Sequence, residues 1–338
     1  MALNPKLNIY VLTLNPRDKN SSPTFRDLLS AKYSLDRKLD DNELQLKLYQ
    51  DFLDKVGKDN FRNDTESKKV IGVSKYDGQE GKSSIYYSSI KNLISGIIDG
   101  GQYGRLRAYA NINNKEHKTI LNTDEAVLDK FYICLCTPLN SMTGFLFIQS
   151  YTEASIQEPV KKFIQELLEF QNNFFSLLIT PYIPKKFIEY YHKNAHIRMF
   201  SYRSKIPVSK IMRKNQILFK NQPFDVEINI KPIEDIVLDE ETVGALDEAF
   251  SKTKFDNLSL GDFGDRSVYI KNGMQHNAHF DITKGIQNIR PTIYLEEEGI
   301  GIDKETGQPD FGQIKSYVEN LLEEVKNEYN DQDEVEEL

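Results

Sequence analysis

The residues with the clearest potential for chemistry are eight cations between Tyr190 and Phe224, a stretch without Asp or Glu. The whole chain, by contrast, has 43 Lys and Arg against 51 Asp and Glu and a net charge of −8. Lysine and arginine neutralise phosphates, and aromatic side chains such as Phe200 and Tyr202 can stack on exposed bases. We call this stretch the basic segment, and it predicts a surface for nucleic acid or another polyanion. Its cations are Lys193, Arg198, Arg203, Lys205, Lys210, Arg213, Lys214 and Lys220.

Two other interpretations of the basic segment stay open. Its cations can dock an acidic protein or a second copy of the chain, or they can pair with acids from the second half of the chain and simply be solvated. The stretch from Glu319 to Leu338, with nine carboxylates and one lysine, could also compete with a polyanion for these cations. We expect that stretch to be an ordinary solubilising tail instead.

A second candidate for anion binding is DGGQYGRLRAY, from Asp99 to Tyr109. Its three glycines let the backbone approach an anion closely, and Arg105 and Arg107 follow at alternate positions of an expected strand. The stretch lacks the G-x-x-x-x-G-K-[ST] pattern of a phosphate loop and is not a dinucleotide fingerprint. A hairpin turn at Gly100-Gly101 is the simpler explanation of the glycines. The two arginines are expected to help the basic segment hold nucleic acid.

No set of residues predicts a metal site. His276, His279 and Asp281 are close in sequence, but the two histidines fall on opposite faces of an expected strand. His192 and His196 are four residues apart without the central glutamate of a zinc-protease H-E-x-x-H motif. We therefore expect neither a metal nor another cofactor.

Catalytic motifs are missing from the sequence as well. Asp225, Glu227 and Lys231 bring two acids and a lysine together, as in a magnesium-dependent nuclease, but the usual Glu-x-Lys spacing is not met. No G-x-S-x-G, kinase or Cys/His nucleophile pattern occurs. The sequence therefore assigns no catalytic residue. Whether the protein is an enzyme stays open, with a metal-dependent nuclease of an unrecognised family as the alternative.

Composition and length indicate a folded chain of two domains. Hydrophobic residues make up 39% of 338 residues, with 19 Phe and 18 Tyr, which is enough to build cores. The longest apolar runs fall short of the roughly 20 residues that a membrane helix needs, and the first residues lack a signal pattern. Cys134 and Cys136 lie two positions apart on an expected strand, where a disulfide is disfavoured. We expect a reducing, cytoplasmic environment.

The elements that position these residues are expected to form an α+β fold. LNIYVLTL (Leu7 to Leu14) predicts a strand. Asp40 to Val56 predicts an amphipathic helix with Asp40 or Asp41 as its cap and Gly57 as its stop. Between Lys82 and Ser150, turn signals at Gly100-Gly101 and Asn140-Ser141 predict two hairpins and so a four-stranded antiparallel sheet. EASIQEPVKKFIQELLEFQNNF predicts a long helix that covers this sheet.

The second half of the chain alternates strand and helix patterns. Strands are expected in FFSLLITPYI, HIRMFSYRSKI, FDVEINIKPI and RPTIYLEEE, with a hairpin turned at Asn272-Gly273. Helices are expected in IPKKFIEYYHKN, DEETVGALDEAFSK and PDFGQIKSYVENLLEEVKNEY. We expect an N-terminal α+β domain over 1–180, a second mixed α/β unit with the basic segment over 181–328, and a frayed acidic tail over 329–338.

Two stretches resemble known proteins in their layout of hairpin and helix. They are DKFYICLCTPLNSMTGFLFIQSYTEASIQEPVKKFIQELL and RPTIYLEEEGIGIDKETGQPDFGQIKSYVENLL, which together cover less than a third of the chain. They resemble uncharacterised accessory proteins of bacterial phage-defence loci, in which a nucleic-acid sensor or adaptor accompanies a separate effector. The resemblance implies such a sensor or adaptor role. It carries no catalytic motif and transfers no functional residue.

The sequence as a whole predicts a cytoplasmic nucleic-acid-binding sensor or adaptor subunit. It is expected to bind DNA or RNA through the basic segment with help from Arg105 and Arg107, to associate with a protein partner or a second copy, and not to enter a membrane. One alternative is a scaffold whose basic surface docks an acidic protein. The other is the magnesium-dependent nuclease.

Overall fold

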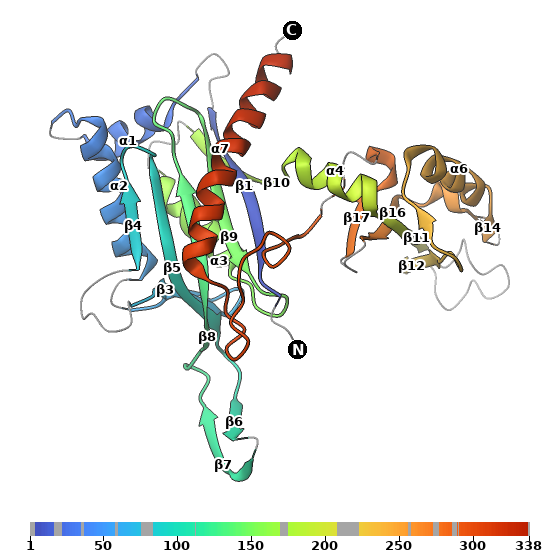
Figure 1. Cartoon of the computed structure of the whole chain (residues 1–338), viewed down its shortest axis with the longest axis horizontal. Coiled ribbons are helices and arrows are strands. Elements are labelled where there is room, and N and C mark those ends of the chain that lie inside the picture. Colours follow the sequence, from blue (N-terminus) through green and yellow to red (C-terminus); the bar gives the residue numbers. More distant parts are fainter. Residues whose placement is uncertain are drawn as a thin grey trace. The chain divides into compact units, whose positions relative to one another are not determined.

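The computed structural model describes residues 4–16, 22–34, 37–57, 60–75, 84–111, 113–169, 175–207, 223–255, 258–272, 277–285, 289 and 291–336. Within them the chain combines helices with antiparallel sheets, which confirms the expected α+β class (Figure 1). The chain divides into two compact units, of which the first holds Met1–Tyr182 with Ile293–Leu338 and the second holds Ile183–Thr292. No helix of the described part is long and apolar enough to cross a membrane.

This division differs from the expected domains at the C-terminal side. The sequence assigns 181–328 to one domain, whereas the residues after 292 return to the first unit. They return because the short strand β18 (Ile293–Tyr294) pairs with β1 (Lys6–Pro16) and because the helix that follows packs on the same sheet. The end of the expected strand RPTIYLEEE, from Leu295 to Glu298, is a turn instead.

Nine strands form the sheet of the first unit, and every recorded pair in it is antiparallel. The strand order is β10-β1-β9-β8-β5-β3-β2, with β18 beside β1 and β4 beside β5. The expected hairpin at Asn140-Ser141 is confirmed, because it joins β8 to β9. The remaining strands are β2 (Arg62–Asp64), β3 (Lys69–Val73), β4 (Ile85–Ser88), β5 (Leu93–Gln102), β8 (Val127–Cys136), β9 (Thr143–Ser150) and β10 (Phe175–Tyr182).

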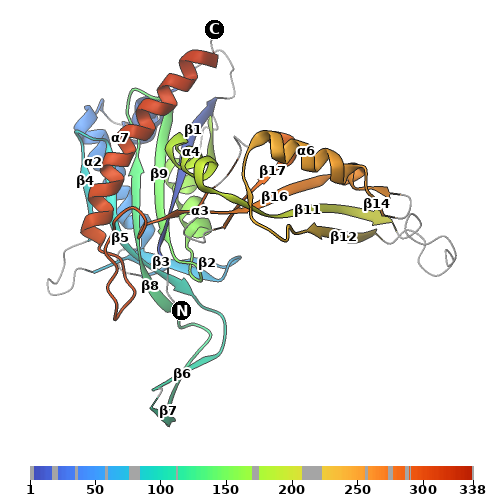
Figure 2. The same ribbon diagram turned by 45° about the vertical axis from the view of Figure 1, so that its right-hand side comes forward.

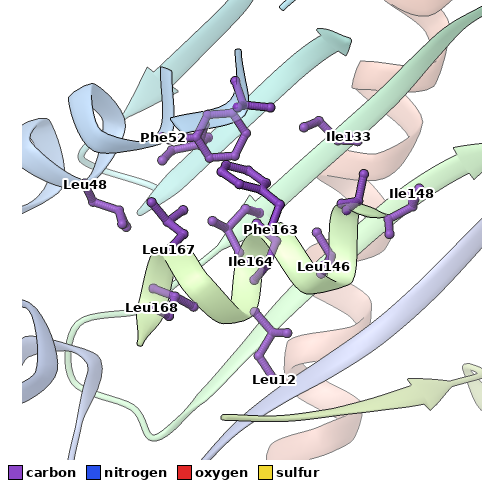
Figure 3. Packing of buried hydrophobic residues seen from close by; sticks show 14 of the residues in the cluster. Leu12, Leu48, Phe52, Ile133, Leu146, Ile148, Phe163, Ile164, Leu167 and Leu168 are labelled. Carbon is purple, nitrogen blue, oxygen red and sulfur yellow. The ribbon is translucent and has the colours of Figure 1, made fainter. Parts of the chain in front are cut away.

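Three helices cover one face of this sheet: α1 (Phe25–Tyr33), α2 (Asp41–Val56) and α3 (Gln157–Leu168). Their apolar residues recur at intervals of three and four, which places them on one side of each helix. Figure 3 shows Phe52 of α2 against Phe163 of α3, with ring centroids 5.0 Å apart and planes at 77°. This cluster forms the main core of the first unit.

Helix α7 (Phe311–Glu336) lies on the opposite face of the sheet, where it contacts β8 and β5 (Figures 1 and 2). Its buried residues follow the expected helical spacing. Glu319 of α7 also accepts from Lys91 Nζ at 2.6 Å. The sequence predicts a frayed tail over 329–338, but the helix continues to Glu336. The buried side chains of α7 are Ile314, Val318, Leu321, Leu322 and Val325.

The expected turn at Gly100-Gly101 is wrong, because both glycines lie inside β5. A Cβ atom on Gly101 would lie 1.8 Å from the carbonyl oxygen of Val127, and one on Gly100 would lie 2.6 Å from Cγ2 of Ile156. The glycines therefore serve close packing rather than chain reversal. As a result β5 and β8 run beside each other over their whole length, from Leu93↔Cys136 to Gln102↔Val127.

Beyond the end of this long pair, the chain forms a separate two-stranded ribbon that projects from the sheet (Figures 1 and 2). It consists of β6 (Arg107–Asn111) and β7 (Asn114–Leu121), which pair antiparallel. We call residues 103–126 the arm and the adjoining ends of β5 and β8 its root. Two backbone bonds fix the root, from Tyr103 N to the Lys68 oxygen at 3.0 Å and from Gly104 N to the Thr123 oxygen at 2.9 Å.

The second unit is built on a five-stranded antiparallel sheet in the order β12-β11-β16-β17, with β13 beside β11. Its core includes Phe200, Tyr202, Val268 and Ile270 on one face of the sheet, and Val243 of helix α6. The expected hairpin of β16 and β17 is confirmed. The elements are α4 (Lys185–Asn194), β11 (His196–Pro207), β12 (Pro223–Ile230), β13 (Ile236–Val237), α6 (Glu240–Ser251), β14 (Lys254–Phe255), β15 (Leu258–Ser259), β16 (Asp265–Lys271) and β17 (Asn277–Asp281).

Candidate nucleic-acid interface

The first half of the basic segment lies on β11, where side chains alternate between the core and an open face. Phe200 and Tyr202 are buried in the core, so they are not available to stack on bases as the sequence predicts. Arg203 lies on the open face. Across the ladder it stands opposite Glu227 of β12 and Asp265 of β16, so its neighbours on both sides are acids.

Arg203 is held by a carboxylate of the neighbouring strand. Its Nε donates to the two oxygens of Asp225 at 2.9 and 3.1 Å, and its Nη2 also donates to Asp225. The hydrogen bonds and the charge of Asp225 raise the pKa of the Arg203 guanidinium, and the same contacts lower the pKa of Asp225. A phosphate would have to displace this carboxylate before it could use Arg203.

Arg198 is ion-paired as well, because its Nη1 lies 3.2 Å from Oδ1 of Asp235. Lys193 at the end of α4 and Lys205 on β11 are exposed. Within the described residues no carboxylate lies at ion-pair distance from either lysine. The four remaining cations of the basic segment, Lys210, Arg213, Lys214 and Lys220, lie outside the described residues.

The acids that meet these arginines come from the alternating pattern of β12. Asp225, Glu227 and Asn229 point to the open face, while Val226 and Ile228 between them pack against the core. Glu227 also accepts from Asn229 Nδ2 at 3.0 Å. The open face around Arg203 is therefore a mixed-charge surface with a hollow of about 250 Å³. The sequence does indicate these acidic neighbours, since Asp225 and Glu227 directly follow the basic segment.

His279 and Asp281 line the hollow of the open face, but they are not placed to form a metal site with other described residues. His279 stacks on Tyr269, with ring centroids 5.4 Å apart, and Asp281 accepts from the backbone N–H of Thr283 at 2.9 Å. His276 lies outside the described residues. Among the side chains that the structure describes, no group of three His, Cys, Asp or Glu is placed to hold a metal ion.

The two cysteines are packing residues on the face of the sheet opposite to the main core. Cys134 and Cys136 are free and fully buried. Burial raises the pKa of the Cys136 thiol to about 11, because the charged thiolate would lose its water. A thiol in this state is a poor nucleophile at neutral pH.

The arm, in contrast, carries cations that have no acidic partner among the described residues. Arg105 and Lys118 are exposed, and Arg107 donates from Nη2 to Oε1 of Gln102 at 2.8 Å. At the root, the Lys68 ammonium lies 5.7 Å from the ring centroid of Tyr103. Within the part of the chain that the structure describes, no carboxylate lies at ion-pair distance from these four cations.

An aromatic side chain accompanies Arg107. Tyr109 is 60% exposed and lies two residues after Arg107 on β6, so the two side chains share one face of the ribbon. Thr119 stands opposite Tyr109 on β7 and adds a hydroxyl to the same face. We call this the cationic face of the arm. It has the mixture of charge and exposed ring that the sequence predicts for the basic segment.

Comparison with known protein families and with curated proteins finds no match to this chain. The class of the protein is therefore defined by its own fold and surfaces: an α+β protein of two units with a projecting β-ribbon that carries exposed cations.

Proposed function

We propose that the protein is a cytoplasmic nucleic-acid-binding adaptor that makes its main contact through the cationic face of the arm. The observation that carries this proposal is the contrast between two sets of arginines. Arg198 and Arg203 of β11 are ion-paired with acids of their own sheet. Arg105 and Arg107 of the arm have no acid at ion-pair distance among the described residues.

Unpaired cations are what phosphate binding requires. A cation that already holds a carboxylate must give up that contact, whereas a solvated one loses only water and releases counterions from the nucleic acid. A two-stranded ribbon also has dimensions that fit the major groove of DNA. On single strands, Tyr109 can stack on a base beside Arg107. Both modes use the same face of the arm.

The basic segment keeps a secondary role in this proposal. Lys193 and Lys205 are exposed and add positive charge, and the four cations outside the described residues remain a sequence-based prediction. The resemblance to accessory proteins of phage-defence loci supports testing phage DNA and RNA first. An adaptor role needs no catalytic group of this chain.

The test is binding of short single- and double-stranded DNA and RNA, measured by fluorescence anisotropy over a series of salt concentrations. The variant is Arg105→Ala with Arg107→Ala, and its matched control is Lys47→Ala with Lys304→Ala, which removes two exposed cations elsewhere in the first unit. We expect the arm variant to lower affinity and to reduce the slope of log K against log salt by about 2, roughly one for each lost phosphate contact. The control should leave both unchanged.

Three outcomes would overturn the proposal. Binding that is equal in the arm variant and the parent would remove the arm from the interface. No binding of any nucleic acid at low salt would leave an acidic protein as the anionic partner. Cleavage of the probes with magnesium, abolished by a chelator, would make the protein a nuclease instead of an adaptor.

A further inference from the structure

Three hydroxyl groups gather on the face of the first unit's sheet that lies under α7. They belong to Tyr86 of β4, Ser95 of β5 and Tyr132 of β8. Tyr86 stands directly opposite Ser95 in the pairing of β4 with β5. Cys134 stands opposite Ser95 on its other side, and Tyr132 lies two residues before Cys134 on the same strand. Side chains alternate along a strand, so these residues share one face of the sheet. We call the three hydroxyl groups the hydroxyl cluster.

The hydroxyl cluster is enclosed and has no direct partner. Ser95 is 0% and Tyr132 1% exposed, and the hydroxyl oxygen of Tyr86 is buried as well. Lys315 of α7 lies above, with its Nζ 3.9 Å from the centroid of the Tyr86 ring. None of the three hydroxyl oxygens has a hydrogen-bond partner among the described residues. Burial of a hydroxyl without a hydrogen bond is unfavourable, so the cluster requires a bonding partner.

Other inward-facing phenols of the first unit do have direct acceptors. The Tyr33 hydroxyl donates to Oδ2 of Asp51 at 2.8 Å. The Tyr151 hydroxyl donates to the backbone oxygen of Lys130 at 3.0 Å. These two phenols need no bridging group. The hydroxyl cluster differs from them because its polar atoms face one another rather than a carboxylate or a carbonyl.

The members of the hydroxyl cluster are close enough to influence one another. Burial, and after it the nearby Cys134 and Tyr86, raises the pKa of the Tyr132 hydroxyl. The Ser95 hydroxyl acts on this pKa in the opposite direction. The three hydroxyls are therefore neighbours, although they make no direct hydrogen bond with one another.

We infer that the hydroxyl cluster holds a buried water molecule that bridges its three side chains. A buried water makes about three hydrogen bonds to polar groups that have no other partner. Because water both donates and accepts, it can serve all three hydroxyls whichever way their hydrogens point. A direct bond between two of the hydroxyls would leave the third without a partner. Ser95 is short compared with the tyrosines on either side, which leaves room for a water between the phenol oxygens.

The bridging water links strands that are not adjacent in the sheet. β4 has four residues and, among the described strands, pairs only with β5. The water connects β4 to β8 across β5, below a helix that Glu319 anchors to Lys91. It can exchange with solvent only when α7 or the strands beneath it loosen. This inference does not rest on nucleic-acid binding.

The first test counts the long-lived internal waters of the full chain by magnetic relaxation dispersion of water oxygen. The variant is Tyr132→Phe with Ser95→Ala, which removes two of the three hydroxyls and keeps the aromatic ring. We expect it to lose the signal of one internal water, because an apolar cavity stays dry. The matched control is Tyr151→Phe, which removes a buried hydroxyl that already has a direct acceptor. It should keep the signal of the parent.

A crystal structure of the parent provides the second test and does not depend on the folding of any variant. We expect a water oxygen within about 2.7–3.2 Å of all three hydroxyl oxygens. Hydroxyls that bond directly to one another or to another protein group would overturn the inference. An ion in place of the water, revealed by anomalous scattering after exchange of chloride for bromide, would overturn it too. So would equal internal-water signals in the parent and the double variant.

Discussion

Strand β11 and the arm both carry exposed arginines, and within the described residues those of β11 are ion-paired whereas Arg105 and Arg107 of the arm have no carboxylate at ion-pair distance. The strand that pairs with β11 supplies Asp225 and Glu227 at alternate positions of the open face. The strand that pairs with β6 supplies Thr119 and Leu121 instead. A high local count of cations therefore does not identify an anion site. An anion site also requires that the neighbouring strand places no acid beside these cations.

β11 and the arm also differ in what supports a strand that carries charged side chains. β11 is the second strand of a sheet with a core beneath it, so its open face can be polar without loss of stability. The arm has only two strands and depends on its root. We therefore expect the largest effect of a single substitution to come from the root, where β5 and β8 approach most closely.

Gly101→Ala tests this dependence. The added Cβ would lie 1.8 Å from the carbonyl oxygen of Val127, so the paired strands at the root must move apart. We expect the free energy of unfolding to fall by about 1–3 kcal/mol, the usual cost of overpacking. The measurement is denaturant unfolding of both variants against the parent. The control is Gly244→Ala in α6, which meets nothing within 4 Å and should be neutral or slightly stabilising. If the two variants were equally stable, β5 and β8 could move apart at the root without a loss of stability.

The same pair of glycines shows where sequence reasoning fails. Gly-Gly is a turn signal, and the pattern alone cannot distinguish a chain reversal from the close approach of two strands. Sequence patterns gave correct predictions where the interaction lies within a few residues of the chain. Asp40 caps α2 by accepting from the Glu43 N–H, and Gly57 ends the helix at φ 105°, both as the spacing predicts.

Part of the candidate site could likewise be predicted, because it depends on a local pattern. Arg105 and Arg107 could be chosen from their expected alternation on a strand. The structure places Arg107 on β6 and Arg105 in the bend before it, and no carboxylate of the described residues lies at ion-pair distance from either. The ion pairs of Arg198 and Arg203 depend on strand pairing, and a count of charges along one segment cannot predict which strands pair. Leu106 and Ile120 of the arm are exposed, and the sequence pattern does not predict this, because it does not show whether another layer covers the arm.

Removing the acids of β12 should make the open face of β11 resemble the arm. Asp225→Asn with Glu227→Gln leaves Arg203 and Lys205 on the open face without their neighbouring carboxylates. We expect nucleic-acid affinity at low salt to rise by up to about tenfold, since freed cations gain phosphate contacts. Anisotropy titrations measure this gain.

The matched control for that variant is Asp54→Asn with Glu305→Gln, which removes two exposed acids of the first unit. It changes the net charge by the same amount without freeing an arginine. A gain that is equal in both variants would mean that net charge alone sets affinity. The pairing of Arg203 would then be irrelevant to binding.

A smaller effect is expected when the paired arginines themselves are removed. Arg198→Ala and Arg203→Ala break exposed ion pairs, so each should change the free energy of unfolding by less than about 1 kcal/mol. Nucleic-acid affinity should change far less than for the arm variant, because these guanidinium groups already hold carboxylates. The same titrations compare the two pairs of arginines directly. A loss as large as that of the arm variant would place the interface on β11.

The smallest effect concerns the pH dependence of the Arg203–Asp225 pair. Hydrogen bonds and charge from Arg203 lower the pKa of Asp225 below its ordinary value of 3.8. A carboxyl whose pKa is lower in the folded state stabilises the fold above its unfolded pKa, and this contribution is lost as pH falls through the folded pKa. The difference in unfolding free energy between the parent and Asp225→Asn should therefore shrink as pH falls from about 5 to about 3. Arg105→Ala removes no ion pair among the described residues, so the difference in unfolding free energy between this variant and the parent should stay constant over that range. If the Asp225→Asn difference were equally constant, the pair would not form in solution, and β11 and the arm would be alike in offering free arginines.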